Sequence, residues 1–262
     1  MVRCGTCGFY YVNPRPVLDE KAREHTYGES SSYHFDPVTK TEVVDPVLRA
    51  RLDHEFSIIR RFSSPGSRML EVGSGEGDFL LYANSASYRA QGVEYTPRFA
   101  RYCKEVLKLE VAEGSLAGQH FPDAQFDIAV YIMVLEHTDS PRAEVEEVGR
   151  ILKPGGILYL TVPNDGGLSS SLRRTVFKAR ESLGLGRSKI PDDPYWTPHH
   201  LFGFSVRCLR YLAGRSGFDV VHLRSCSTVG RHGRLASAIL DQYHRLCQGS
   251  KLRAVLRKKS AT

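Results

Sequence analysis

The sequence predicts an α/β fold: a doubly wound, mostly parallel sheet with an N-terminal arm and a helical insertion after the fifth strand. Three observations support this prediction. From Arg68 onward, short apolar segments alternate with segments of helical periodicity, which is typical of βαβ units. A glycine-rich turn, Gly73 to Gly77, separates the first apolar segment from a helical one. The segment Phe126 to Val134 is apolar almost throughout, as a central strand of a parallel sheet should be.

The length of 262 residues is enough for one domain with additions. We expect an arm over 1–50, a main domain over 51–230 that includes the insertion 165–198, and a C-terminal helix and basic tail over 231–262. The apolar patterns place strands at about 68–72, 90–94, 109–112, 126–134, 157–162 and 218–223. Helical patterns cover about 45–62, 79–83, 99–107, 141–152, 205–216 and 235–246.

Charge and hydropathy narrow the class of protein. The longest apolar run, Ile128 to Leu135, is too short to span a bilayer, and the first residues lack a signal-peptide pattern, so we expect a cytoplasmic protein. The net charge is +7, and after Asp241 the chain has six Lys and Arg residues and no acid. Such a tail can meet nucleic acid or anionic lipid. No RNA-binding aromatic pattern accompanies it, so we favour a solvated end.

The glycine turn predicts a ligand at the start of the following helix. A dinucleotide fingerprint would need a glycine at position 78, which is Asp78. Carboxylates surround the turn, and they would repel a pyrophosphate but attract a ligand with sulfonium and ammonium groups. S-adenosylmethionine is such a ligand, with Glu71 placed to pair with its amino group and the glycines allowing close backbone approach. The alternative is a glycine-rich loop that binds nothing.

A second acid extends the predicted site. Glu94 ends the next apolar segment, 17 residues beyond Gly77, close to the spacing of a ribose-binding carboxylate after a glycine turn. A carboxylate can accept hydrogen bonds from both ribose hydroxyls. A solvated Glu at a strand end is the alternative.

Five motifs then occur in order, and together they resemble those of class I S-adenosylmethionine-dependent methyltransferases. More narrowly, the chain resembles the small-molecule methyltransferases related to the ubiquinone-biosynthesis O-methyltransferases. The resemblance extends from about Arg51 to about Val221. The motifs are LEVGSGEGDF (70–79), GVE (92–94), FDIAVYIMVLEH (126–137), RILKPGGILYLTVPN (150–164) and HHLFGFS (199–205).

This resemblance implies a Rossmann-like fold, S-adenosylmethionine as cofactor, and a small-molecule acceptor. It implies a seventh, antiparallel strand, which the pattern does not locate, and a substrate wall built by 165–198. It also makes Tyr27 and Tyr33 candidates for a lid over the cofactor, although they could equally pack the arm against the core. Ser115 stands where the family often has an acid for the adenine amino group. The implied cofactor-binding residues are Glu71, Gly73, Ser74, Gly75, Gly77, Glu94, Tyr95, Ser115, Met133 and His137.

For an oxygen acceptor the enzyme needs a nearby base. His137 follows the C-terminal end of the fourth strand, where ligands bind in such sheets, and is the first candidate, with His199 and His200 next. Glu136 and His137 could instead only cap the turn and shape the pocket. Oxygen methylation is the preferred interpretation. A cofactor-binding protein that acts through partners without catalysis, and an NAD-dependent oxidoreductase, are the alternatives.

Cys4 and Cys7 form a Cys-x-x-Cys pair, which is half of a tetrahedral zinc site. Relatives of the family often open with a zinc knuckle whose second half resembles Cys4 to Pro16. His25 and His34 could complete a site, but their spacing does not favour this. We expect no bound metal.

Overall fold

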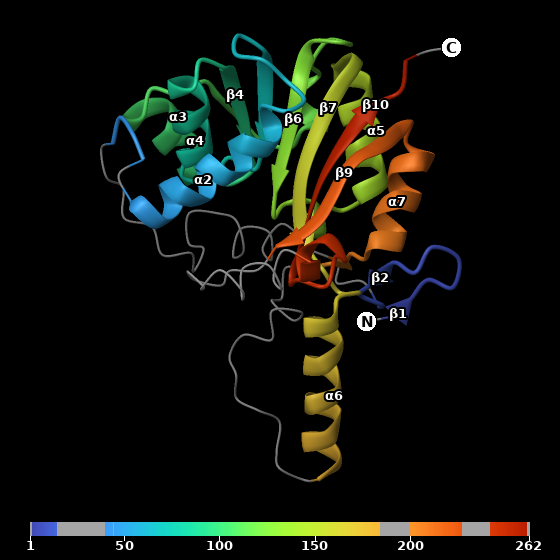
Figure 1. Cartoon of the computed structure of the whole chain (residues 1–262). Helices are drawn as coiled ribbons and strands as arrows, with labels where there is room; N and C mark the ends of the chain where they lie inside the picture. Colours follow the sequence, from blue (N-terminus) through green and yellow to red (C-terminus); the bar gives the residue numbers. More distant parts are fainter. Residues whose placement is uncertain (1, 15–39, 44, 184–199, 227–241, 261–262) are drawn as a thin grey trace.

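The computed structural model describes residues 2–14, 40–43, 45–183, 200–226 and 242–260. Its centre is a seven-stranded sheet in the order β5-β4-β3-β6-β7-β10-β9 (Figure 1). Neighbouring strands from β5 to β7 are parallel, and β10 is antiparallel to both β7 and β9. This confirms the predicted mostly parallel sheet. The strands are β3 (Arg68–Val72), β4 (Arg89–Glu94), β5 (Val111–Glu113), β6 (Phe126–Ile132), β7 (Leu152–Pro163), β9 (Phe218–Cys226) and β10 (Lys251–Lys258).

Helices cover both faces of this sheet, as a doubly wound fold requires (Figure 1). Strand side chains alternate between the two faces, so Met69 joins one hydrophobic cluster and Leu70 the other. The Met69 cluster includes residues of α2 (Pro46–Ile59), α3 (Asp78–Ser85), α4 (Pro97–Arg101) and the π-helical turn η1 (Tyr102–Val106). The Leu70 cluster includes residues of α5 (Pro141–Ile151) and α7 (Val206–Arg215).

Short-range capping interactions set the boundaries of several helices. The Asp45 carboxylate accepts from the backbone N–H groups of Val47 and Leu48 at the start of α2. Ser205 caps α7, because its hydroxyl accepts from the N–H of Cys208. Gly217 follows the end of that helix with φ +78°, a left-handed conformation that favours glycine.

The structure corrects the prediction of a solvated basic tail. Residues Lys251–Lys258 form β10, the seventh strand, inserted between β7 and β9. Leu252 to Leu256 are buried, and the Arg253 guanidinium forms an ion pair of 2.6 Å with Glu55 of α2. The Lys and Arg residues of β10 are therefore part of a strand that is paired on both sides. The predicted helix over 235–246 lies mostly outside the described residues.

The N-terminal arm contributes a small second sheet. β1 (Val2–Arg3) and β2 (Tyr10–Tyr11) pair with each other, and β2 pairs with β8 (Phe202–Gly203), so the arm is joined to the segment that precedes α7. Within the predicted insertion, α6 (Leu168–Ser182) begins just after β7 and extends away from the sheet (Figure 1). Among the described residues, no helix is long and apolar enough to cross a membrane.

Candidate functional site

The glycine turn lies at the carboxyl end of β3, and each glycine has a left-handed φ. A Cβ at Gly73 would lie 2.4 Å from Cγ2 of Val134, and one at Gly77 would lie 2.8 Å from Cδ1 of Leu109. Gly75 is different, because a Cβ there would meet nothing within 4 Å. Gly73 and Gly77 therefore let protein segments pack closely. Gly75 has no side chain above the turn, so a ligand can approach the backbone there.

Glu94, at the end of β4, fixes the shape of this turn. One carboxylate oxygen accepts the N–H of Gly75 at 2.7 Å, and the other accepts the N–H of Thr96 at 2.7 Å. The side chain is buried. An ionised carboxylate has about four lone-pair positions, so two remain for ligand hydroxyls. The residue predicted to bind ribose is thus also the residue that orders the glycine turn.

Glu71 and Ser74 carry buried polar atoms that the described residues leave without hydrogen bonds. These atoms are Oε2 of Glu71 and Oγ of Ser74. Burial raises the pKa of the Glu71 carboxyl well above its usual value, and the nearby charges of Glu94 and Asp78 raise it further. Lys40 neutralises part of this charge through an ion pair of 2.5 Å with Asp78. A cationic group bound above the turn would favour the ionised form of Glu71 and give it a partner, so these residues fit S-adenosylmethionine.

Two other predicted cofactor residues follow strands β4 and β5, at the same edge of the sheet as the glycine turn. Tyr95 directly follows Glu94 and is 42% exposed. Ser115 is exposed, and its hydroxyl accepts the N–H of Gly118 at 3.2 Å, within the short helix Ala117–Gln119. The structure thus gives Ser115 a local role. Contacts of Tyr95 or Ser115 with adenine stay predictions.

The segment after β6 brings the remaining predicted residues beside the glycine turn. Met133 has φ +57°, a left-handed conformation uncommon for a non-glycine residue, and its N–H donates to Thr161 at 2.9 Å. This bend leads to Val134, which packs against Gly73, and then to the short helix Leu135–His137. The chain conformation thus places His137 one helical turn beyond the contact with the glycine turn.

His137 and His200, predicted as separate candidates, lie next to each other. Their ring centroids are 4.7 Å apart, with an interplanar angle of 67°. The N–H of Leu201 donates to the carbonyl of Glu136 at 2.9 Å and joins the two segments. His199, Tyr27, Tyr33, His25 and His34 lie outside the described residues.

Glu136 is a site residue to which the sequence analysis gave no chemical role. It is fully buried, and neither carboxylate oxygen has a hydrogen-bond partner in the described part of the chain. Burial raises its pKa to about 8. Its signal in the sequence is an acid that follows a mostly apolar strand, beside a histidine.

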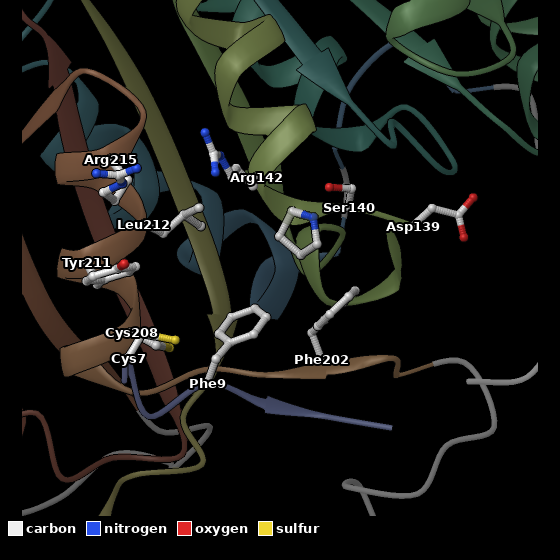
Figure 2. Close-up of a pocket in the computed structure, with 11 residues that line it drawn as sticks. Cys7, Phe9, Asp139, Ser140, Arg142, Phe202, Cys208, Tyr211, Leu212 and Arg215 are labelled. Carbon is white, nitrogen blue, oxygen red and sulfur yellow. The ribbon is translucent and has the colours of Figure 1, made fainter. Parts of the chain in front are cut away.

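Cys4 and Cys7 are free thiols in the loop between β1 and β2. Backbone N–H groups of Cys7 and Thr6 approach the Cys4 sulfur and lower its pKa. Cys208 of α7 lines the same cavity as Cys7 (Figure 2). Among the described residues, however, the only group of three potential metal-ligand side chains with all ligand atoms within 4.8 Å of one another does not include Cys4 or Cys7.

A separate cavity of about 370 Å³ lies between the small sheet, the start of α5, and α7 (Figure 2). Phe9 and Phe202 form one wall, and Arg142 and Arg215 lie toward the other end. None of the predicted cofactor or catalytic residues lines it. We therefore locate the functional site by its chemistry, at the carboxyl edge of β3, β4 and β6.

The sheet order and the acidic glycine turn define a class I methyltransferase fold, and comparison with known proteins agrees. A family model described as a methyltransferase domain matches residues 47–223. The chain belongs to this family, whose methyl donor is S-adenosylmethionine.

Curated relatives include a Mycolicibacterium smegmatis protein described as a probable S-adenosylmethionine-dependent methyltransferase, 30% identical over 100 residues, which are 38% of this chain and 39% of that one. A sterol 24-C-methyltransferase of Gibberella zeae is 32% identical over 142 residues, covering 51% of this chain and 37% of the relative. The chain thus spans less than half the length of these relatives.

Among solved structures, a methyltransferase of Methanosarcina mazei has a TM-score of 0.56 at 19% identity, covering 78% of this chain and 98% of that chain. The cyclase SpnF has the same TM-score at 19% identity, covering 81% of this chain and 83% of its own. At this identity the likeness shows the fold alone.

Proposed function

We propose that this protein transfers the methyl group of S-adenosylmethionine to an oxygen atom of a small-molecule acceptor. The observation that carries the proposal is a juxtaposition. Buried acids at the glycine turn, which suit a cationic cofactor, lie beside a segment that ends in Glu136 and His137 and meets His200. Val134 joins the two regions through its contact with Gly73.

The residues of the turn would hold the cofactor, whose sulfonium supplies an activated methyl group. Glu71 would pair with its ammonium group, and the free lone pairs of Glu94 would accept the ribose hydroxyls. Gly75 leaves room for this approach. Ser74, Tyr95, Ser115 and Met133 complete the proposed cofactor set, as the resemblance implies. The protein's main contribution is positioning of the two reactants.

His137 is the proposed general base, and His200 is its alternative. Each imidazole could take the proton of an acceptor hydroxyl, since both rings are partly exposed and lie at the edge where cofactor and acceptor would meet. The narrower resemblance to ubiquinone-biosynthesis O-methyltransferases suggests phenolic acceptors. A cytoplasmic location also stays a prediction.

The test is turnover with labelled S-adenosylmethionine against a panel of phenols, alcohols and sterols. We expect His137→Ala to lower kcat about 100-fold while cofactor affinity, measured by calorimetry, hardly changes. The wild-type rate should rise through a pH near the imidazole pKa, and this rise should be missing in the variant. His120→Asn, at an exposed histidine, is the matched control. A rise in KM with unchanged kcat would instead assign His137 to pocket shape.

A carbon acceptor is the second candidate, because four of the relatives compared are sterol 24-C-methyltransferases. The position of the label in the product decides between oxygen and carbon. The similarity of SpnF shows that this fold also occurs in a protein named as a cyclase, so binding without methyl transfer is a further outcome. Formation of S-adenosylhomocysteine with any acceptor excludes it. NAD in place of S-adenosylmethionine in the calorimetry tests the oxidoreductase alternative.

A further inference from the structure

We propose that Glu136, His137 and His200 form a binding site for a divalent first-row transition metal. The three side chains come from two segments, the short helix Leu135–His137 after β6 and the residue His200 just before β8, which the hydrogen bond from Leu201 to Glu136 holds together. Two imidazoles and one carboxylate are a ligand set that zinc, iron(II), cobalt and nickel all accept.

The distances suit such an ion. The ligand atoms of the three residues all lie within 4.8 Å of one another, and Nε2 of His137 is 4.0 Å from Oε1 of Glu136. Two ligand atoms on one tetrahedral zinc lie about 3.4 Å apart, given metal–ligand distances of about 2.0 to 2.2 Å. Side-chain movements on the order of 1 Å would therefore close the site, and no backbone rearrangement is needed.

The environment of Glu136 supports a metal site independently of these distances. Its side chain is fully buried, and both carboxylate oxygens lack a hydrogen-bond partner within the described ranges. Its own backbone N–H lies near, but the geometry falls short of a hydrogen bond. Lys251 attracts it electrostatically but forms no ion pair with it, and Asp165 repels it. A buried carboxylate in this position is costly unless a cation or hydrogen-bond donors compensate it.

Three protein ligands leave one or more coordination positions open, which is typical of catalytic rather than structural metal sites. This part of the inference rests on the proposed function. With an ion bound, the two imidazoles would be ligands and not general bases, so the metal would replace the base role proposed above for His137. An acceptor oxygen in an open position would lose its proton to solvent more readily, because the metal would stabilise the anion. The acceptors that fit best are then phenols or alcohols with a second oxygen close enough to chelate.

The experiment is a titration of the full chain with Co²⁺ and Zn²⁺, without cofactor or acceptor. A Cys4→Ser/Cys7→Ser background removes the other candidate thiol ligands of the N-terminal loop. We expect one Co²⁺ per chain, with visible d–d bands and no thiolate charge-transfer band. Glu136→Gln, His137→Ala and His200→Ala should each weaken binding at least ~10-fold, since even loss of an outer-shell partner can cost that much. His120→Asn should bind like the parent, because Asn tolerates the left-handed φ of +49° at this exposed position.

Two results would overturn the site: no saturable binding at millimolar Co²⁺, or binding that survives Glu136→Gln. S-adenosylmethionine affinity, measured for each variant, reports whether the neighbouring turn is still folded. Glu136→Gln keeps the side-chain shape, so it decides the question if a histidine variant fails to fold. Metal binding without any methyl transfer would leave the site standing and refute the proposed function. Full turnover after chelation would refute the catalytic role of the metal.

Discussion

Removal of the Glu94 carboxylate should destabilise the protein even without its cofactor. Glu94→Ala leaves two backbone N–H groups without their acceptor, those of Gly75 and Thr96. A hydrogen bond to a charged group contributes about 1.5 to 3 kcal/mol to stability, and a buried N–H left unsatisfied costs a similar amount. Thr96 is buried, so water cannot replace its partner, whereas the Gly75 interaction is only partly buried.

We therefore expect a loss of about 3 kcal/mol in the free energy of unfolding, mostly from Thr96. Glu94→Gln should lose about half as much, because the amide oxygen can replace one acceptor while the NH₂ group faces the other N–H. Urea denaturation followed by circular dichroism measures both values.

Glu113→Ala is the matched control, since Glu113 lies opposite Glu94 on the neighbouring strand β5 and is exposed. It should change stability by less than about 0.5 kcal/mol. A loss of stability in Glu94→Ala no larger than that in this control would refute the claim that the carboxylate orders the turn.

The second proposed role of Glu94 is to bind the ribose of the cofactor, and titration calorimetry with S-adenosylmethionine tests it. We expect S-adenosylmethionine affinity to fall by about 2 kcal/mol, or roughly 30-fold, and equal affinity would refute the ribose assignment.

Further predictions concern other parts of the chain. Gly75→Ala should cost only the left-handed strain of about 1 to 2 kcal/mol, whereas Gly73→Ala also collides with a neighbouring side chain and should cost more; the reverse order in urea denaturation would contradict this. Gly75→Val should abolish cofactor binding in calorimetry and leave the circular dichroism spectrum unchanged. Burial, and then nearby arginines, lower the pKa of His222 from 6.5 to about 4. The unfolded chain therefore takes up its proton first, so stability should fall from pH 6.5 toward pH 4, by about 1 kcal/mol after allowance for solvent screening of this half-buried ring. His222→Gln should flatten this limb, and an unchanged pH profile would exclude the effect. Cys4→Ser/Cys7→Ser should melt like the parent protein, and loss of one zinc per chain would show a metal site there.

The local sequence predicted those features whose signals are themselves local. Asp45 and Ser205 cap helices because short polar side chains reach backbone N–H groups two or three residues away. The glycine turn and Glu94 were found because a βα unit fixes the spacing between its glycines and the acid of the next strand.

Local patterns could not locate β10. The excess of Lys and Arg over acids near the chain end predicted an exposed tail, yet the strand lies between β7 and β9. Arg253 is tolerated there because Glu55 pairs with it from a helix 198 residues earlier. No window of the sequence contains both residues, so only the folded chain shows that this charge is compensated.

Some features of the candidate site likewise follow from the sequence, and others only from the tertiary structure. The sequence by itself determined an α/β methyltransferase fold, the acidic glycine turn and the position of His137 just beyond strand β6, because these depend on residue type and spacing. The tertiary structure decided that His200 lies against His137 and that the carboxylate of Glu136 is buried with no hydrogen-bond partner among the described residues. These relations arise when two segments distant in the chain are joined by a backbone hydrogen bond, from Leu201 to Glu136, and burial of a carboxylate depends on every segment that packs over it.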